Sequence, residues 1–75
     1  MEYTIDTKEF RKAMIDKGIN SLSDLSEKSK VSKTTISSIL NGKTRPKAFT
    51  IEALAKALDL SGDDIGRIFF KKKLA

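Results

Sequence analysis

Residues 25–42 read LSEKSKVSKTTISSILNG, and this stretch predicts two short helices joined by a tight turn. In its second half, Ile36, Ile39 and Leu40 recur at the spacing of one helical face. Leu25 takes the corresponding inward place on the first helix. The second helix is therefore expected to be held against a core by one apolar stripe, with its other side turned outward.

Short polar residues occupy the ends and the outer side of this second helix. Ser32 precedes the stripe, where its hydroxyl can cap the helix, and Gly42 can adopt the left-handed conformation that ends it. A surface helix that needed only solubility would more usually carry Glu, Lys and Gln. Short hydroxyl side chains instead let a backbone approach another surface closely and can bond to base edges or phosphates. The pattern predicts that the helix enters the major groove of duplex DNA, with these residues turned outward: Lys33, Thr34, Ser37 and Ser38.

The same stretch resembles the helix-turn-helix of the phage repressor and Cro superfamily, the Xre-type regulators. The common form of that motif is roughly L-A-x-x-x-G-V-S-x-x-x-I-S-x-x-x-N-G. Residues 43–47 (KTRPK) resemble the basic loop after the recognition helix, and residues 50–60 with Ile65 resemble the fourth and fifth helices. The resemblance covers about residues 10–69. The matching motif positions are Leu25, Val31, Ser32, Ile36, Ser37, Asn41 and Gly42.

Three positions depart from the family pattern. Ser26 replaces the usual small Ala, and it is still small enough for close helix packing. Lys30 replaces the usual turn Gly, so a lysine is expected to adopt positive φ at a cost of about 1 kcal/mol. Leu22 replaces the Gln that often opens the second helix and touches the DNA backbone. That phosphate contact is therefore left without its usual side chain.

The resemblance implies an all-α fold, a compact five-helix lambda-repressor-like DNA-binding domain that spans residues 1–75. Apolar residues at helical spacing predict five helices, at about residues 7–17, 22–29, 33–41, 51–59 and 62–70. Residues 71–75 are expected to form a basic tail. Phe49 is expected to plug into the domain. Helix caps are expected at Asp6 or Thr7, and at Ser21, Thr50 and Ser61.

The resemblance also assigns DNA contacts. Lys33, Thr34 and Ser38 fall at the base-contacting positions of phage repressors. Residues better placed for phosphates or for fixing the helix are Ser32, Thr35, Ser37 and Asn41. Alternatively, Asn41 is only the C-cap of the helix and contacts nothing else. The Ser21 hydroxyl lies where this family often contacts a phosphate, although helix capping alone also explains it.

The loop at residues 43–47 carries three cations, Lys43, Arg45 and Lys47, that could follow the sugar-phosphate backbone. Arg45 is the best candidate for entering a minor groove. The alternative is that this loop is an ordinary exposed linker.

Composition excludes several classes of protein. Seventy-five residues make one small domain, and dimerisation would add to its modest stability. The absence of cysteine and histidine excludes disulfides and the common zinc sites, and it removes the usual general base. We therefore expect no metal, no cofactor and no enzymatic activity. No apolar run approaches a membrane span and no signal peptide is visible, so a cytoplasmic protein is expected.

Charge is unevenly distributed along a chain of formal net charge +5. Residues 28–51 contain six basic residues and no acidic one, whereas residues 1–27 and 52–64 are net acidic. The basic block coincides with the outward helix and its loop. This coincidence is what a surface that faces a polyanion requires.

The C-terminal end gives a second possible contact surface. Phe70 lies beside the apolar stripe of the last helix and, with Leu74, could contact a second copy or a partner. Alternatively, Phe70 covers the edge of the first helix. The lysine run at 71–73 could add general DNA affinity or be a solvated tail. Residues 1–6 carry no functional indication, although Tyr3 and Ile5 alternate and are expected to pack loosely on the core.

These observations predict a sequence-specific DNA-binding transcriptional regulator, of Cro-like or repressor type, that reads a pseudo-palindromic operator as a homodimer. The alternative is a protein-interaction module of a phage switch, an anti-repressor, modulator or antitoxin-like protein that binds a partner repressor.

Overall fold

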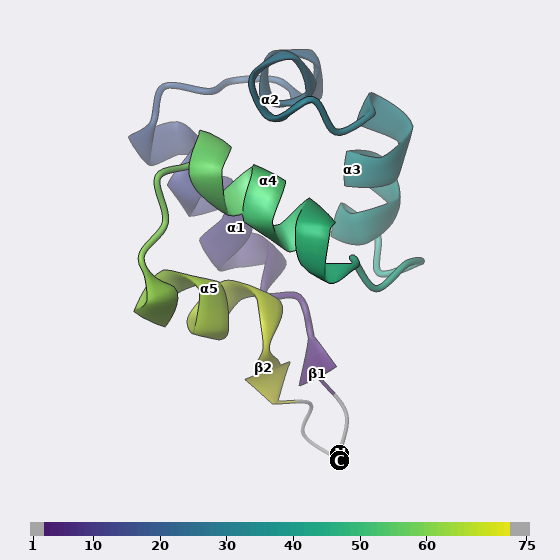
Figure 1. The fold of residues 1–75 in the computed structure, drawn as a ribbon, viewed down its shortest axis with the longest axis vertical. Coiled ribbons are helices and arrows are strands. Elements are labelled where there is room, and N and C mark those ends of the chain that lie inside the picture. The colour runs from purple at the N-terminus through teal and green to yellow at the C-terminus, as the bar shows by residue number, and fades with distance from the viewer. Residues whose placement is uncertain (1–2, 73–75) are drawn as a thin grey trace.

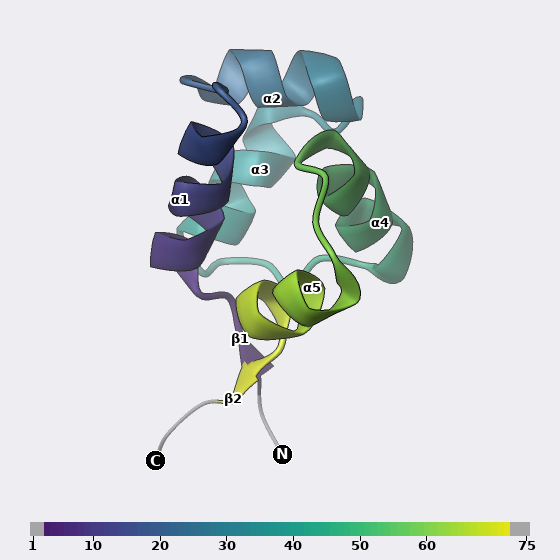
Figure 2. The same cartoon turned by 90° about the vertical axis from the view of Figure 1, so that its left-hand side faces the viewer.

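The computed structural model describes residues 3–72, which form five helices around one core and a two-stranded ribbon at one end (Figure 1). The expected all-α fold is confirmed. The view in Figure 2 shows that the ribbon brings the two ends of the described chain together. In chain order the elements are β1 (Tyr3–Thr4), α1 (Thr7–Asp16), α2 (Leu22–Ser29), α3 (Lys33–Leu40), α4 (Ala48–Ala57), α5 (Gly62–Phe69) and β2 (Lys71–Lys72).

Side-chain oxygens cap four of the five helices in the described chain. Each accepts a hydrogen bond from the backbone N–H three residues further on, a group that has no partner within the helix. The donor–acceptor distances are 3.1–3.2 Å. The expected caps are thereby confirmed at Asp6, Ser21, Ser32 and Ser61.

The start of α4 corrects two expectations. The helix begins at Ala48 after Lys47, three residues earlier than predicted, so Thr50 lies buried inside the helix instead of capping it. Phe49 is 70% exposed and does not plug into the domain. The reason is helical phase, because Phe49 lies two residues before the buried Ile51 and is thus turned to about the opposite side of the helix.

The core is formed by apolar side chains from all five helices and the short connection after α1. Phe10 of α1 and Phe69 of α5 meet edge to face at 5.8 Å between ring centroids, which joins the first and last helices. The other fully buried large side chains are Ile19, Leu25, Ile36, Ile39, Leu54 and Ile68.

The turn between α2 and α3 depends on one left-handed residue. Lys30 has φ 67°, as its place in the glycine position of the motif predicts, and its N–H donates to the Ser26 carbonyl at 2.8 Å. The buried Ser29 hydroxyl then accepts from the Val31 N–H at 3.2 Å. These bonds fix the direction in which α3 leaves the turn.

The ribbon was not expected from the sequence. Tyr3 pairs with Lys72 and Thr4 with Lys71 in antiparallel register. The Asp6 N–H extends the connection by donating to the Ile68 carbonyl at 2.8 Å. The first two residues of the predicted basic tail are therefore strand residues, and residues 1–2 and 73–75, including Leu74, lie outside the described residues.

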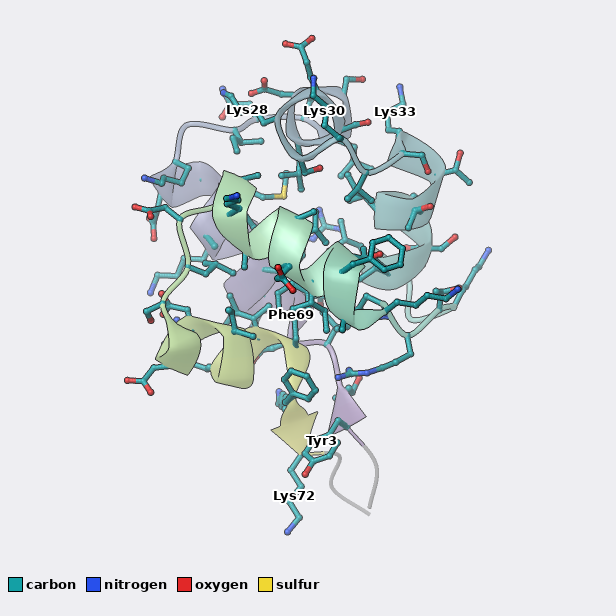
Figure 3. All side chains as sticks on the ribbon, in the orientation of Figure 1. Tyr3, Lys28, Lys30, Lys33, Phe69 and Lys72 are labelled. Carbon is teal, nitrogen blue, oxygen red and sulfur yellow. The ribbon has the colours of Figure 1, made fainter. Side chains whose placement is uncertain are left out.

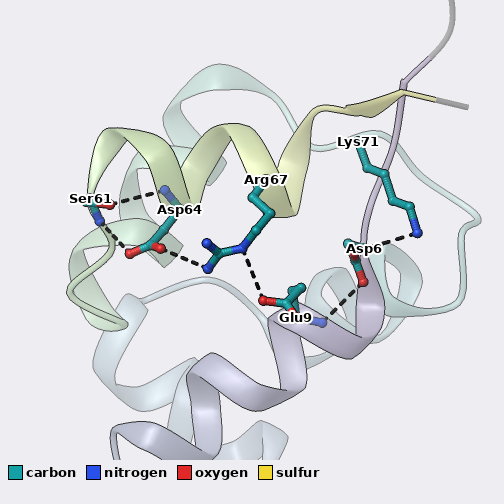
Figure 4. A network of polar contacts seen from close by, with 6 residues as sticks. All are labelled: Asp6, Glu9, Ser61, Asp64, Arg67 and Lys71. Atoms are coloured by element: carbon teal, nitrogen blue, oxygen red, sulfur yellow. Dashed lines mark hydrogen bonds and ion pairs between the residues drawn. The ribbon is translucent and has the colours of Figure 1, made fainter.

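A polar network joins α1 to α5 (Figure 4). Arg67 donates from Nη2 to Asp64 at 2.8 Å and from Nε to Glu9 at 3.1 Å. Asp64 also accepts from the Ser61 N–H at 3.0 Å, which completes a reciprocal capping box. The backbone N–H and hydroxyl of Ser61, and then Arg67, hold the pKa of Asp64 below its ordinary value.

Replacing Lys30 with Gly should stabilise the protein by up to about 1 kcal/mol, because glycine adopts positive φ without the steric cost that lysine bears. Lys28→Gly is the matched control and should destabilise by about 1 kcal/mol, because Lys28 lies in the last turn of α2. Urea unfolding of the three proteins measures both changes. Equal effects from the two substitutions would contradict the role given to Lys30.

Replacing Asp64 with Asn should lower the unfolding midpoint in urea at pH 7, because the ionised carboxylate interacts favourably with Ser61 and Arg67. The pKa of Asp64 is depressed in the folded state, so its stabilisation is present above the unfolded pKa of about 3.9 and is lost as pH falls through the folded pKa. The difference between the two proteins should therefore shrink below about pH 4. A difference that stays constant down to pH 2.5 would count against this assignment.

Candidate nucleic-acid interface

The α2–turn–α3 unit places α3 at the side of the domain, with α2 above it and α4 beside it in Figure 1. α2 packs against both of these helices. Ile36, Ile39 and Leu40 are buried against the core, as their spacing predicts. The opposite side of α3 is accessible along its whole length.

The outward side of α3 carries the residues that the resemblance assigned to base contacts. At about 100° per residue, Thr34, Ser38 and Asn41 lie opposite the buried stripe, with Lys33 toward one flank. Lys33, Thr34 and Asn41 are exposed, whereas Ser38 is half-buried. None of the outward polar side chains is packed inside the molecule.

Lys33 is directed toward α2. Its Nζ donates to Ser23 Oγ at 3.0 Å, and Figure 3 shows Lys28, Lys30 and Lys33 spread along the end of the domain formed by α2. Lys28 is paired with Asp24 at 3.6 Å across one turn of α2. The Lys33 ammonium therefore sits at the junction of the two helices, close to the start of α3.

Several hydroxyl and amide groups of the candidate interface have partners within the fold. Ser32 Oγ accepts from the Thr35 N–H and donates to Thr35 Oγ1 at 2.8 Å, which fixes the first turn of α3. Asn41, the C-cap of α3, donates from Nδ2 to Ser37 Oγ at 3.4 Å. A helix-fixing role is therefore present for these four residues. Their DNA contacts, like that of Ser21, remain predictions.

The loop after α3 is exposed at Lys43, Arg45 and Lys47, while Pro46 is buried and anchors it. Gly42 begins the loop with φ 71°, where a left-handed residue was expected. The loop cations lie beyond the C-terminal end of α3, whereas Lys30 precedes its N-terminal end and Lys33 is its first residue. Positive charge thus flanks α3 at both ends, which favours approach of a polyanion.

An aromatic contact that sequence analysis missed connects this loop with the ribbon. The Arg45 guanidinium carbon lies 4.8 Å from the centroid of the Phe70 ring. The Phe70 ring meets Tyr3 edge to face at 5.9 Å. Phe70 therefore contacts β1 and the basic loop while staying 44% exposed.

Other kinds of site are not seen in the described part of the chain. Residues 3–72 contain no cluster of acidic, histidine or cysteine side chains that could hold a metal ion. No helix among them is long and apolar enough to cross a membrane.

An outward polar helix set in a helix-turn-helix and flanked by cations defines the class of helix-turn-helix DNA-binding domains. The family model for helix-turn-helix proteins matches residues 9–65, and the chain belongs to this family of DNA-binding transcription regulators, within the phage repressor and Cro superfamily. No curated protein and no solved structure matches the chain. The matched segment runs from α1 into α5 and leaves the ribbon outside it.

Proposed function

We propose that the protein is a sequence-specific regulator, Cro-like or of repressor type, that inserts α3 into the major groove of its operator. The observation that carries the proposal is the division of α3 into a buried apolar stripe and an accessible polar side. Lys33 bonds to guanine O6 or N7, Thr34 reaches a base edge or a thymine methyl, and Ser38 reads a neighbouring base.

The loop cations and the helix-end hydroxyls fix the position of the domain on the DNA. Lys43, Arg45 and Lys47 follow the sugar-phosphate backbone, while Ser21 and Ser32 offer hydroxyls at helix N-termini, where backbone N–H groups also favour phosphate. Six phosphate contacts would give a log–log salt slope of about −5.

Two copies bind one operator in this proposal. A homodimer sets its two α3 helices about 34 Å apart, one turn of DNA, on a pseudo-palindrome. Phe70 and Leu74 are the proposed contacts between copies. The partial exposure of Phe70 supports this placement, because its ring retains accessible area after contacting Tyr3 and Arg45.

A second candidate function is binding of a partner repressor. The observation that favours it is Phe49, exposed at the edge of a hollow of about 450 Å³ between α2 and α4. Lysines line this hollow together with Ala53 and Ala57. Duplex binding that stays weak for the protein alone at low salt, and becomes tight only when a repressor is added, would favour this candidate.

Selection of binding sites from random duplexes tests the first candidate, with Lys33→Ala and Thr34→Ala as variants. Each substitution should reduce discrimination at its own base position by about 1–3 kcal/mol and leave the fold intact. In contrast, Arg45→Ala should weaken all duplexes alike and make the salt slope shallower by about 1. Lys12→Ala is the charge-matched control, because Lys12 lines a hollow formed by α1 and α5 to which neither α3 nor its loop contributes, and it should change neither quantity.

The division of roles would be wrong if the α3 and Arg45 substitutions had the same effect on every sequence. The proposed function itself would be wrong if the unmodified protein selected no sequence and bound duplexes only weakly at low salt.

A further inference from the structure

Arg45 is the one loop cation whose charged group rests on a described side chain of another element. Its guanidinium lies over the face of Phe70, 4.8 Å from the ring centroid. Lys43 belongs to the same loop but makes no cation–π contact within residues 3–72. The position of Arg45 is thus set by more than the backbone of the loop.

Both the backbone and the ring of Phe70 have contacts that restrict their position. The Phe70 backbone N–H donates to the Gly66 carbonyl at 3.1 Å, and the preceding Phe69 is fully buried in the core. The Phe70 ring meets the Tyr3 ring edge to face, with 5.9 Å between the ring centroids. Tyr3 is in turn paired with Lys72 in the ribbon, and Figure 3 labels both residues at that end of the molecule. The ring therefore offers Arg45 a fixed surface.

Stacking on a ring leaves an arginine able to bind phosphate. A ring that contacts the guanidinium carbon forms no hydrogen bond with the group, so the N–H donors in the guanidinium plane remain available to a phosphate. An arginine on an exposed loop without such a contact would lose most of its rotamer freedom when it is fixed on DNA. A stacked one has already lost part of that freedom before binding.

We propose that Phe70, supported by Tyr3, is a positioning residue that orients Arg45 for contact with the DNA backbone. This inference rests on the proposed function, in which Arg45 binds the sugar-phosphate backbone. In this proposal the ribbon contributes to the DNA-binding surface through Tyr3, although it lies outside the segment matched by the helix-turn-helix family. A small hollow of about 130 Å³ separates the ribbon from residues Gly42 to Arg45, so the two segments face each other directly.

Two substitutions at Phe70 distinguish the effect of its aromatic ring from the effect of apolar side-chain volume. Phe70→Leu keeps an apolar side chain but removes the ring, and it should weaken duplex binding about twofold to fivefold, the range for an exposed cation–π contact. Phe70→Tyr keeps the ring and should bind like the unmodified protein. Ile15→Ala trims an exposed apolar side chain of α1 and serves as the control without effect on binding. Thermal unfolding of each variant establishes that it is folded.

A double substitution tests whether Phe70 acts through Arg45. In the Arg45→Ala background, Phe70→Leu should cause a smaller loss of affinity than it causes when Arg45 is present, because only the contact between copies is then left to lose. An independent readout without DNA is the chemical shift of the Arg45 side-chain protons, which should lie upfield because of the ring and return to ordinary values in Phe70→Leu.

Three results would overturn the positioning role. The first is unchanged or tighter binding by Phe70→Leu. The second is an equal loss of affinity with and without Arg45, which would leave Phe70 only its contact between copies. The third is loss of binding by Phe70→Tyr despite a retained ring shift. Failure of the unmodified protein to bind any duplex would instead overturn the proposed function, so the two failures are distinguishable.

Discussion

The burial of one apolar stripe on α3 is the constraint on which the rest of the structure depends. Ile36, Ile39 and Leu40 fix how far the helix is rotated about its own axis, and so they determine which residues face away from the core. A shift of one residue would turn the outer side by about 100° and carry Thr34 and Ser38 away from it. Capping by Ser32 and the left-handed Lys30 fix where the helix starts and in which direction it runs. The accessible polar side is thus a consequence of core packing.

Features that depend on neighbouring residues could be predicted from the sequence. The caps at Ser21 and Ser32 need only a hydroxyl before an apolar repeat, and the positive φ of Lys30 follows from its place in the motif. α2 has the predicted bounds, and the ends of α1, α3 and α5 differ from the prediction by one residue. The outward placement of Thr34 and Ser38 could be predicted for the same reason, because spacing along one helix determines which residues share a face.

Features that depend on contacts between distant segments could not be predicted. Two-residue strands carry too little periodicity to indicate pairing, so nothing in residues 1–6 pointed to Lys71 and Lys72. The stacking of Arg45 on Phe70 depends on that pairing and was missed with it. The start of α4 was predicted wrongly for a different reason, because Thr50 is a plausible cap by residue type. The helix instead begins at Ala48, which buries Thr50 and turns Phe49 outward.

The ribbon also decides where anything attached to the protein would lie. Tyr3 and Lys72 are paired, so a purification tag or a fluorescent label fused at either end would emerge from the same corner of the domain. That corner adjoins the Phe70 ring on which Arg45 rests. Labels for binding assays are therefore better attached away from the chain ends, for example through a cysteine that replaces the exposed Lys12 of α1, because the natural chain has no cysteine to compete for the reagent.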